Sequence, residues 1–493
     1  MGLEHRLVAA QRECPGDLVT PVSAYLRLKG RGARFLLESV EGGERSSRFS
    51  ILGLGSLSRI WADSTGTLAR DQLGIVTRLA GPERDPLDEA LRFIHSWTVE
   101  EDFPLPPCAG GLVGTVAYDY ARRLERLGSP PPGAALPDVL FEFVSEVVVF
   151  DHLRHELQIT VLAEEQDRSR VRDRLDEIEA ALVCADPDER VPSKRPRLHA
   201  TMSDQAYCAG VERLLAHIRD GDIFQAVLSK ETDVQDSPPL FGVYRALRRV
   251  NPSPYMFYLD LGDVVVAGSS PESAVRMNDG QVRLRPIAGT RRRGATESED
   301  QSLEQELRES RKERAEHAML VDLARNDLSR VAVPGSVRVR ELAQVERFSH
   351  VMHLVSDVEG TVPNGFSPAD VIRATFPVGT VSGAPKIRAM QLIDDYEASR
   401  RNLYGGCLGY IGRNGDMDMA LVIRSAVRAG GRTTIRAGAG VVAGSTPEGE
   451  LAECRSKLEA MRTAIHMAAG CQQEESEAGE VVEVSRGAEE TRS

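Results

Sequence analysis

The stretch IRAGAGVVAGSTPEGELAECRSKLEAM, residues 435–461, predicts a β-strand, a glycine-rich turn and a helix in succession. β-Branched residues lead into the run, and Pro447 suits the first position of a helix that we expect to continue to Met461. Glu450 and Glu453 lie three residues apart on that helix, so both carboxylates share one face. The stretch therefore joins a strand to a helix with an acidic face.

The segments before this stretch predict further antiparallel strands and amphipathic helices. Apolar residues recur at helical spacing between Ser203, the expected cap, and Gly221. Hairpin turns are expected at residues 260–263 and 278–280, and the run MALVIRSAV, residues 419–427, is expected to form one strand. Mixed antiparallel strands with helices to one side indicate an α+β fold of layered sheets flanked by helices.

A second acidic pair, Glu313 and Glu316, lies on a helix expected after Ser310. Ser310 and Glu313 fit the S-x-x-E capping box, which by itself accounts for Glu313. Two helices that each present carboxylates could hold a magnesium ion, which prefers oxygen ligands and leaves positions open for substrate oxygens. Glutamates at this spacing are also common on helix surfaces, so the spacing alone leaves both interpretations open.

Two glycine-rich runs and a histidine pair do not match nucleotide or zinc motifs. Residues 379–386, GTVSGAPK, fail the phosphate-loop pattern because Ala384 replaces a required glycine. Residues 438–440 lack the third glycine of a dinucleotide fingerprint, although backbone amides there could bind a carboxylate. His350 and His353 lie three residues apart, which is not the spacing of a zinc protease. Nucleotide binding is therefore not expected.

The composition indicates a protein of the cell interior. The chain has 493 residues, of which 41% are hydrophobic and 27% charged, and no apolar run approaches the ~18 residues of a membrane span. The formal net charge of -13 argues against a nucleic-acid surface, and the seven cysteines form no CxxC pair. We expect a cytoplasmic location, no contact with nucleic acid or membrane, and three regions: residues 1–195, 196–470 and an acidic, disordered tail at 471–493.

Motif-length runs along the chain are similar to those of one enzyme family. They include GDIFQAVLSK, RPIAGTRRRG, ERAEHAMLVDLARNDLSRV, RFSHVMHLVSDVEG, FPVGTVSGAPKIRAM and YGGCLGYIG, in the family's order from about Pro21 to Met461. On these runs the chain resembles the chorismate-utilising enzymes and, among them, the component I family of anthranilate synthases. The resemblance implies Mg2+-dependent amination of chorismate at C2 by ammonia and elimination of pyruvate to give anthranilate, a lyase reaction that begins tryptophan biosynthesis.

The same resemblance implies roles for individual residues. Glu316 and Glu453 match the two magnesium ligands, and Glu272 matches the acid that protonates the departing C4 hydroxyl. His353 matches the histidine beside the reacting ring, and Gln225 and Thr290 complete the expected catalytic set. The residues expected to bind substrate are Gly289, Thr290, Tyr404, Arg424, Gly438, Ala439, Gly440 and Lys457.

Two positions separate the members of this family by their chemistry. Isochorismate and salicylate enzymes carry a lysine base where this chain has Gln225, and an amide cannot serve as a base near neutral pH. Aminodeoxychorismate enzymes carry a nucleophilic lysine in a PIKGT run, where this chain has Ala288. Both differences favour attack by external ammonia. The alternatives are 2-amino-2-deoxyisochorismate synthase, aminodeoxychorismate synthase component I and, from another class, a non-catalytic tryptophan sensor.

Regulation and assembly are implied by the same resemblance. Glu38 and Ser39 in LLES, with Pro254, Tyr255 and Met256 in NPSPYMFY, match a pocket where tryptophan binds and inhibits. Hydrophobic strand pairing would also account for Tyr255 and Met256. No run in the chain matches a glutamine amidotransferase, so we expect a separate glutaminase subunit, component II, or free ammonia to supply the nitrogen. The implied assembly is a hetero-oligomer with two copies of each subunit.

Overall fold

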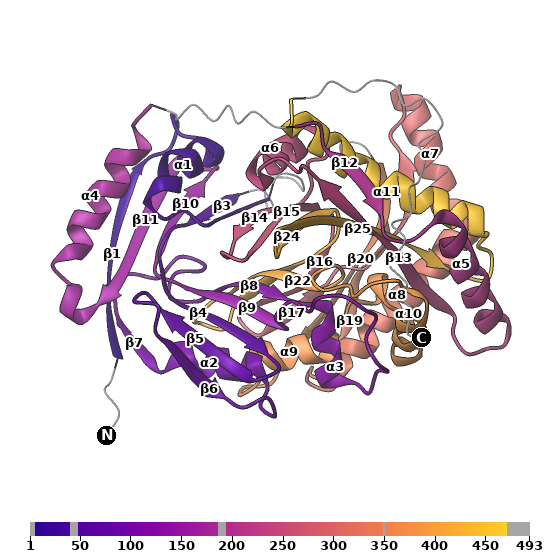
Figure 1. Cartoon of the computed structure of the whole chain (residues 1–493), viewed down its shortest axis with the longest axis horizontal. Helices are drawn as coiled ribbons and strands as arrows, with labels where there is room; N and C mark the ends of the chain where they lie inside the picture. Colours follow the sequence, from indigo (N-terminus) through magenta and orange to yellow (C-terminus); the bar gives the residue numbers. More distant parts are fainter. Residues whose placement is uncertain (1–4, 40–47, 186–193, 349–350, 471–493) are drawn as a thin grey trace, which may run out of the picture.

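Two large β-sheets form the centre of the molecule in this computed structural model, which describes residues 5–39, 48–185, 194–348 and 351–470 (Figure 1). Within these residues the larger sheet has 13 strands. In sheet order they are β12 (Arg197–Ala200), β13 (Gln225–Gln235), β25 (Arg432–Val441), β24 (Ser425–Ala429), β15 (Val264–Ser270), β14 (Tyr255–Asp260), β2 (Phe35–Glu38), β3 (Phe49–Gly53), β10 (Glu146–Asp151), β11 (Glu156–Glu164), β1 (His5–Pro15) and β7 (Trp97–Glu100), with β21 (Gly383–Ala384) paired to β13.

The second sheet has 12 strands over the same described ranges. Their order is β18 (Ile287–Arg292), β20 (Val351–Thr361), β17 (Gln281–Leu284), β16 (Ser273–Asn278), β23 (Met417–Leu421), β22 (Cys407–Ile411), β8 (Leu112–Val116), β9 (Val139–Val144), β4 (Ser56–Asp63), β5 (Gly66–Asp71) and β6 (Val76–Ala80), with β19 (Arg338–Arg347) paired to β20. Pairs such as β13–β25 and β22–β23 are antiparallel, whereas β1 and β7 are parallel. The α+β architecture expected from the sequence is confirmed.

Helices pack against both sheets. They are α1 (Pro21–Leu28), α2 (Pro86–His95), α3 (Ala121–Leu124), α4 (Arg170–Leu182), α5 (Asp204–Arg219), α6 (Leu240–Val250), α7 (Glu297–Glu309), α8 (Arg311–Ser329), α9 (Pro368–Thr375), α10 (Lys386–Tyr396) and α11 (Pro447–Ala468). Leu214, Val243 and Met461 of α5, α6 and α11 share a buried core with the larger sheet. A second core joins α2, α8 and α9 to side chains of both sheets. Figure 1 shows α6 and α11 at the top of the view, α2 and α9 at the bottom, and strands of both sheets between them.

Both sheets take strands from both sides of residue 195. In the larger sheet β14 pairs with β2, so that Met256 lies opposite Glu38. In the second sheet β22 pairs with β8, so that Gly409 lies opposite Gly114. The first 195 residues are therefore joined to the rest by two hydrogen-bonded sheets, and the division of function at residue 195 stays a prediction. The expected tail at 471–493 lies outside the described residues.

The local start signals in the sequence are confirmed. α5 begins after Ser203, whose side chain accepts a hydrogen bond from the amide of Ala206. The strand pairs β14–β15 and β16–β17 form the two expected hairpins. α11 begins at Pro447 and continues to Ala468, beyond the expected end at Met461.

The expected capping box at the start of α8 is only half formed. The side chain of Ser310 accepts a hydrogen bond from the amide of Glu313. The carboxylate of Glu313 instead lies 3.3 Å from Nη1 of Arg291 on β18. A tertiary ion pair has therefore replaced the local bond that the sequence pattern predicts.

The prediction of one strand over residues 419–427 is wrong. β23 ends at Leu421 in the second sheet, and β24 begins at Ser425 in the larger sheet. Between them Arg424 takes a left-handed conformation, with a φ of 48°. The alternation of apolar residues cannot reveal this break, because both halves of the run are buried strands.

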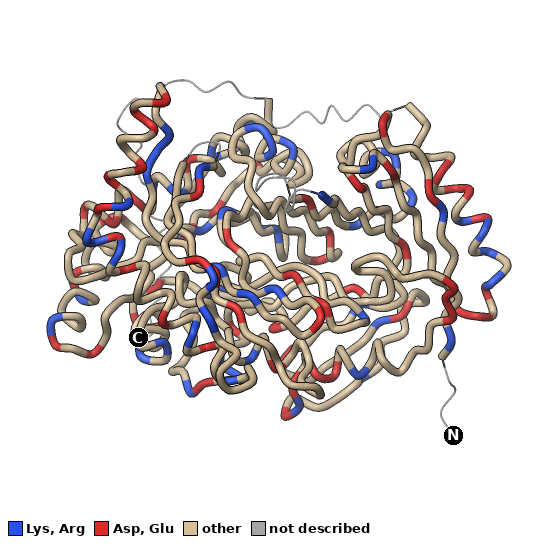
Figure 2. Tube along the Cα trace, turned by 180° about the vertical axis from the view of Figure 1, so that it is seen from behind, with Lys and Arg blue, Asp and Glu red and all other residues tan. Residues whose placement is uncertain are grey.

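Charge and hydropathy of the structure agree with the expectations from composition. Figure 2 shows Lys and Arg interspersed with Asp and Glu along the described chain. Ion pairs such as Arg174 with Glu146, at 2.8 Å, balance many of these charges locally. Among the described helices, none combines the length and apolar character that a membrane crossing requires. The absence of a nucleic-acid partner stays a prediction.

Candidate active site

Two connections between the sheets run side by side and place Glu272 next to Arg424. β15 and β24 are neighbours in the larger sheet, and β16 and β23 are neighbours in the second. The chain therefore crosses from β15 to β16 beside its crossing from β23 to β24. The Ser269 amide donates to the Arg424 carbonyl at 3.1 Å, and the Leu421 amide donates to the Glu272 carbonyl at 3.0 Å. The sheet topology therefore fixes the positions of Glu272 and Arg424.

The Glu272 carboxyl is buried, and its burial favours the protonated form. Its residue is 5% exposed, and Thr380 Oγ1 lies 2.8 Å from Oε1. Burial raises the pKa of Glu272 to about 8, against the opposing effects of the Thr380 hydrogen bond and the positive charges of Lys457 and Arg424. The carboxyl can therefore donate a proton to a bound ligand near neutral pH.

A β-bulge orients His353 on β20. Thr290 pairs with His353 and Ala288 with Leu354, so Gly289 is the extra residue of the bulge, with a φ of 63°. Its carbonyl lies 2.9 Å from His353 Nδ1, and Thr290 Oγ1 lies 3.1 Å from the same nitrogen. Because a carbonyl only accepts, Nδ1 carries the hydrogen and Nε2 keeps its lone pair. Burial lowers the pKa of His353 to about 4, so the ring is neutral, and Nε2 has no partner among the described residues.

Gln225 lies at the start of β13 beside β25 and α8. Val227 pairs with Gly440 across the two strands. A Cβ on Gly440 would lie 2.9 Å from Gln225 Nε2 and 3.8 Å from Glu316 Oε1, so a larger residue there would displace the amide. Gln225 Oε1 is buried and has no hydrogen-bond partner in the described parts of the chain. An amide with a free acceptor oxygen therefore sits close to the acidic face of α8.

The three residues from Gly438 to Gly440 lie on the part of β25 that has left β24. The register between β24 and β25 ends at Ile435, whereas β13 pairs with β25 as far as Val441. Lys457 on α11 donates to the Gly438 carbonyl at 3.1 Å and pairs with Glu453 at 2.7 Å. One edge of β25 is thus available for backbone contacts with a ligand, next to a lysine.

The carboxylates of α8 and α11 lie close enough to affect each other. Burial raises the pKa of Glu316 to about 7, and the negative charges of Glu313 and Glu453 add to the effect. Glu450 is 5% exposed, burial raises its pKa, and its Oε2 has no partner within the described ranges. Negative charge has therefore been gathered where it is unfavourable in the absence of a cation.

This donor set fits a magnesium ion. Carboxylate oxygens are its preferred protein ligands, and it is usually held by one or two carboxylates while water and substrate oxygens complete the octahedron. Glu316 and Glu453 come from two different helices, and the unpartnered Glu450 oxygen offers a third. The residues that the structure describes contain no group of three or more His, Cys, Asp or Glu side chains placed to hold a metal ion. Two carboxylates, one from α8 and one from α11, match the one or two that this ion usually takes from a protein.

Tyr404 enters the site from the segment before β22. The amide of Gly405 donates to the Val422 carbonyl at 2.9 Å, which holds Tyr404 beside the crossing that leads to Arg424. The tyrosine is 8% exposed, and its ring centroid lies 5.6 Å from Cζ of Arg401. The family resemblance implies that Tyr404 binds substrate, and the structure places this residue beside the crossing that leads to Arg424.

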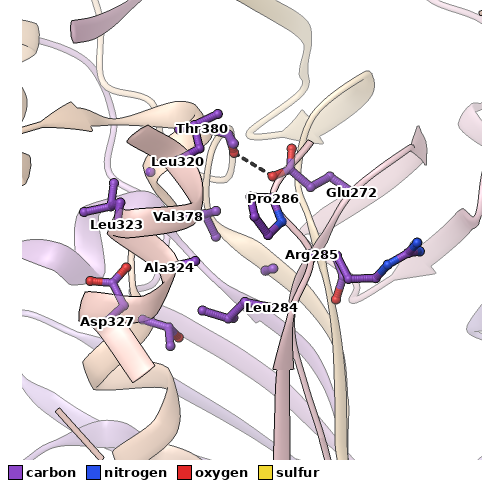
Figure 3. A pocket seen from close by; sticks show the side chains of 14 residues that line it. Glu272, Leu284, Arg285, Pro286, Leu320, Leu323, Ala324, Asp327, Val378 and Thr380 are labelled. Atoms are coloured by element: carbon purple, nitrogen blue, oxygen red, sulfur yellow. Dashed lines mark hydrogen bonds between the residues drawn. The ribbon is translucent and has the colours of Figure 1, made fainter. Parts of the chain in front are cut away.

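A small cavity of about 30 Å³ lies behind Glu272. Figure 3 shows Glu272 and Thr380 at one end and Leu320, Ala324 and Asp327 of α8 along one side. This volume can hold a water molecule but not a ring with two carboxylates. The cavity is therefore a space next to the proton-donating carboxyl and not the binding position of a ring.

The residues matched to a feedback pocket lie away from this site, in β2 and β14. Glu38 is buried opposite Met256, and its carboxylate accepts a hydrogen bond from the Tyr244 hydroxyl. Arg248 Nε lies 3.0 Å from Glu38 Oε2. Ser39 is half-buried directly after β2. Glu38 and Met256 therefore lie directly opposite each other at one end of the strand pair, and Ser39 is the next residue along the chain.

Tyr255 points to the other face of the sheet. Its hydroxyl donates to Asp418 Oδ1 on β23 at 3.1 Å, between the two sheets. Pro254, just before β14, is half-buried. Because successive strand residues alternate faces, the side chains of Tyr255 and Met256 point to opposite faces of β14, and their shared role in a tryptophan pocket stays a prediction.

Sequence reasoning did not single out Thr380 or Arg401. Thr380 lies in the run FPVGTVSGAPKIRAM, but 108 residues separate it from Glu272 and no spacing rule links them. Arg401 stands beside Arg400 in a polar stretch and has no sequence signal for its burial. Only the tertiary contacts reveal both residues.

Comparisons with known proteins show the family to which the chain is similar. A family model described as chorismate binding enzyme matches residues 32–463. The chain is 47% identical over 457 residues to anthranilate synthase component 1 of Thermus thermophilus, covering 92% of this chain and 96% of that protein. It is 40% identical over 483 residues to anthranilate synthase component 1 of Acetivibrio thermocellus, covering 95% and 97%.

Solved structures give the same result. The crystal structure of anthranilate synthase component I from Streptococcus pneumoniae TIGR4 superimposes with a TM-score of 0.76 at 34% identity, covering 92% of this chain and 99% of that one. The menaquinone-specific isochorismate synthase from Escherichia coli matches with a TM-score of 0.72 at 20% identity, covering 93% and 94%, which shows a shared fold alone.

Proposed function

Because the chain belongs to the family of chorismate-binding enzymes and is an enzyme of that family, we propose that it is the large subunit of an anthranilate synthase. It would add ammonia to C2 of chorismate and eliminate pyruvate to release anthranilate. Relatives at 40–47% identity that carry this name support the assignment. The remaining question is which nucleophile the site is built to use.

Gln225 is the residue that favours ammonia over water as the nucleophile. A water molecule needs a base to become a nucleophile, and an amide side chain cannot act as one near neutral pH. The buried Oε1 of Gln225, which has no partner among the described residues, can instead accept a hydrogen bond from ammonia, which already has a free lone pair. Ala288 supplies no amine that could attack in place of ammonia.

The first half of the reaction uses Glu272 as its acid. Arg424 and Tyr404, with the backbone of Gly438 to Gly440, would bind the carboxylates of chorismate, since a guanidinium suits a carboxylate in bidentate fashion. As the ammonia lone pair forms the bond to C2, the ring double bonds shift and the C4–O bond breaks. The departing hydroxyl takes the proton of Glu272 and leaves as water, next to a cavity that has room for it.

The second half removes pyruvate. The new ammonium group at C2 loses a proton to solvent. C2 then gives up its hydrogen as a proton, the C3–O bond breaks, and the ring becomes aromatic. The enolpyruvyl group leaves as the enolate, which takes a proton from solvent at its methylene carbon to become pyruvate. Neutral His353, with Nδ1 committed to the Gly289 carbonyl and Nε2 free, is the acceptor available for that hydrogen. Thr290 and Gly289 fix the orientation of the imidazole.

A magnesium ion would be held by Glu316 and Glu453, with Glu450 close by. When bound, such an ion neutralises a substrate carboxylate and withdraws electron density from the ring. Lys457 would keep the Glu453 carboxylate oriented through their ion pair at 2.7 Å.

Partners and regulation are part of the same proposal. The ammonia would come from a separate glutamine amidotransferase subunit, in an assembly with two copies of each subunit, in the cytoplasm. Tryptophan would bind at the end of β2 and the start of β14 and inhibit the enzyme, with Glu38, Ser39, Pro254, Tyr255 and Met256 as the expected contacts. The buried Glu38 carboxylate, already in contact with Arg248, supports a polar ligand-recognition site at this end of β2.

The decisive experiment incubates the purified chain with chorismate, Mg2+ and ammonium at alkaline pH and records the blue fluorescence of anthranilate. Glutamine in place of ammonium should give no product without a second subunit. Accumulation of 2-amino-2-deoxyisochorismate without pyruvate would assign the shorter reaction. An aminodeoxychorismate product would assign the other alternative, and no turnover of chorismate would refute the proposal.

A further inference from the structure

A buried arginine, Arg401, lies beneath the site and is 5% exposed. It forms a forked ion pair with Glu397, with Nε 3.0 Å from Oε2 and Nη2 2.6 Å from Oε1. The same guanidinium donates to two backbone carbonyls, that of Val381 through Nη1 at 2.5 Å and that of Val227 through Nη2 at 2.6 Å. One side chain thus joins three separate segments of the chain.

Two of these segments carry residues of the site. Val227 lies on β13 two residues after Gln225, and it pairs with Gly440 on β25. Val381 belongs to the short helical turn Gly379–Val381 and directly follows Thr380, the hydrogen-bond partner of Glu272. The Val227 amide also donates to the Ser382 carbonyl at 2.9 Å, so Arg401 reinforces from the side a direct backbone connection between the strand that holds Gln225 and the turn that holds Thr380.

The third segment is the one to which Arg401 itself belongs, and it contains both Glu397 and Tyr404. Cζ of Arg401 lies 5.6 Å from the centroid of the Tyr404 ring and 4.6 Å from that of Tyr118. The amide of Tyr404 also donates to the Arg401 carbonyl at 3.0 Å. A planar guanidinium can contact aromatic rings while its edge donates hydrogen bonds, which an ammonium group cannot reproduce.

Both carboxylate oxygens of Glu397 accept hydrogen bonds within this cluster. Glu397 accepts hydrogen bonds from Ser229 N at 2.8 Å and Ser229 Oγ at 2.7 Å, and Arg436 Nη1 lies 3.0 Å from its Oε2. A buried ion pair is weak evidence for stability, because desolvating both charges offsets their attraction. The connections of this cluster to the site therefore point to a role in geometry.

We propose that Arg401 is a positioning residue that holds Tyr404, the Thr380 turn and the β13 strand in one fixed frame around the bound ring. The inference rests on the proposed function, since it assigns to these segments the binding of carboxylates, the orientation of the acid and the placement of ammonia. Misplacing a reacting group by about 1 Å can cost about 100-fold in rate. Arg401 therefore acts through other residues and does not touch the substrate.

Arg401→Lys is the direct test, since it keeps the charge opposite Glu397 but cannot reach both carbonyls and both rings. We expect kcat with ammonium to fall by about 100-fold, while KM for chorismate rises less, because the reacting groups lose their relative alignment. The alkaline limb of the pH profile should also move to higher pH. A loosened Thr380 bond no longer favours the ionised form of Glu272, whose charged neighbours are Arg424 and Lys457.

Arg413→Lys is the matched control. Arg413 also donates to backbone carbonyls, those of Ile94 at 2.7 Å and of Trp97, but it lies beyond the opposite end of β22 from Tyr404. This variant should keep the wild-type kcat, KM and pH profile. An equal loss in both variants would show that any arginine bonded to backbone carbonyls matters in this way, and would overturn a positioning role for Arg401.

Tyr118→Leu gives a second test if Arg401→Lys does not fold. It removes one ring beside the guanidinium and leaves all ion pairs in place, so kcat and the alkaline limb should change in the same direction by a smaller factor. A folded Arg401→Lys or Tyr118→Leu protein with wild-type kcat, KM and pH profile would reject the inference. A wild-type enzyme that makes no anthranilate would instead reject the proposed function, so the two failures are distinguishable.

Discussion

Thr380 Oγ1 lies 2.8 Å from Glu272 Oε1, and this bond joins a short helical turn to the crossing between the two sheets. The hydrogen bond acts on the buried carboxyl of Glu272. Burial raises the pKa of this carboxyl to about 8. Burial keeps the proton on Glu272, and the hydroxyl of Thr380 favours its release. The balance of these two effects sets the pH range in which Glu272 can act as an acid.

The rate of chorismate amination should fall as pH rises above about 8, because Glu272 then loses the proton that it must donate. Thr380→Val should move this fall to higher pH, since the carboxylate form loses its hydrogen bond. The measurement is kcat/KM against pH, calculated on free ammonia. Thr115→Val is the control, because the Thr115 hydroxyl is buried without a described partner in β8. An unchanged profile in Thr380→Val would contradict the assignment.

Glu272→Gln should lower kcat by about 100- to 10,000-fold, because the amide cannot donate the proton that the departing hydroxyl requires. Chorismate should still bind, since the carboxylate-binding residues are intact. Single-turnover fluorescence and a thermal melt would separate chemistry from folding. The replacement of one buried neutral group by another should leave the melting temperature close to that of the wild type. Retention of full kcat would remove Glu272 from the mechanism.

Chelation of divalent cations should abolish anthranilate formation, and added Mg2+ should restore it. Mg2+ should also stabilise the folded chain, by about 2.7 kcal/mol when its concentration is 100 times its dissociation constant. Glu316→Gln should lose both responses, because one of the two principal ligands is gone. Glu459→Gln, an exposed change on the same helix as Glu453, should keep them. Equal stabilisation of both variants by Mg2+ would place the ion elsewhere.

Arg424→Lys should raise KM for chorismate by about tenfold or more, because an ammonium group cannot bind a carboxylate in bidentate fashion. The left-handed backbone of Arg424 is unaffected by a change between two side chains that both have a Cβ. Steady-state kinetics with ammonium in excess would measure the effect. A KM equal to that of the wild type would exclude Arg424 as the carboxylate holder.

Ser39→Phe should leave turnover intact and raise the tryptophan concentration needed for half inhibition. Ser39 is half-buried after β2, and an aromatic ring there would compete with a ligand for the same space. Met256→Thr should act in the same way but also reduce stability, by about 2–5 kcal/mol, because Met256 is 1% exposed in the core. Inhibition curves at fixed chorismate would test both. Unchanged inhibition in the two variants would reject this pocket.

The sequence by itself determined the local elements and the chemical character of the site. Ser203 starts α5 and Pro447 starts α11, because caps and prolines act within one helical turn. Gln225 and Ala288 exclude a lysine base and a lysine nucleophile at their positions in any fold. The α+β class also followed from the alternation of strand and helix patterns.

The tertiary structure alone decided how these residues meet. It split residues 419–427 at Arg424, because the chain has to pass between two sheets there, and it paired Glu272 with Thr380 across 108 residues. The bulge at Gly289 turned His353 so that Nε2 is free. Burial and strand pairing depend on segments that are remote in sequence, so they determine pKa values and orientations that local patterns cannot encode.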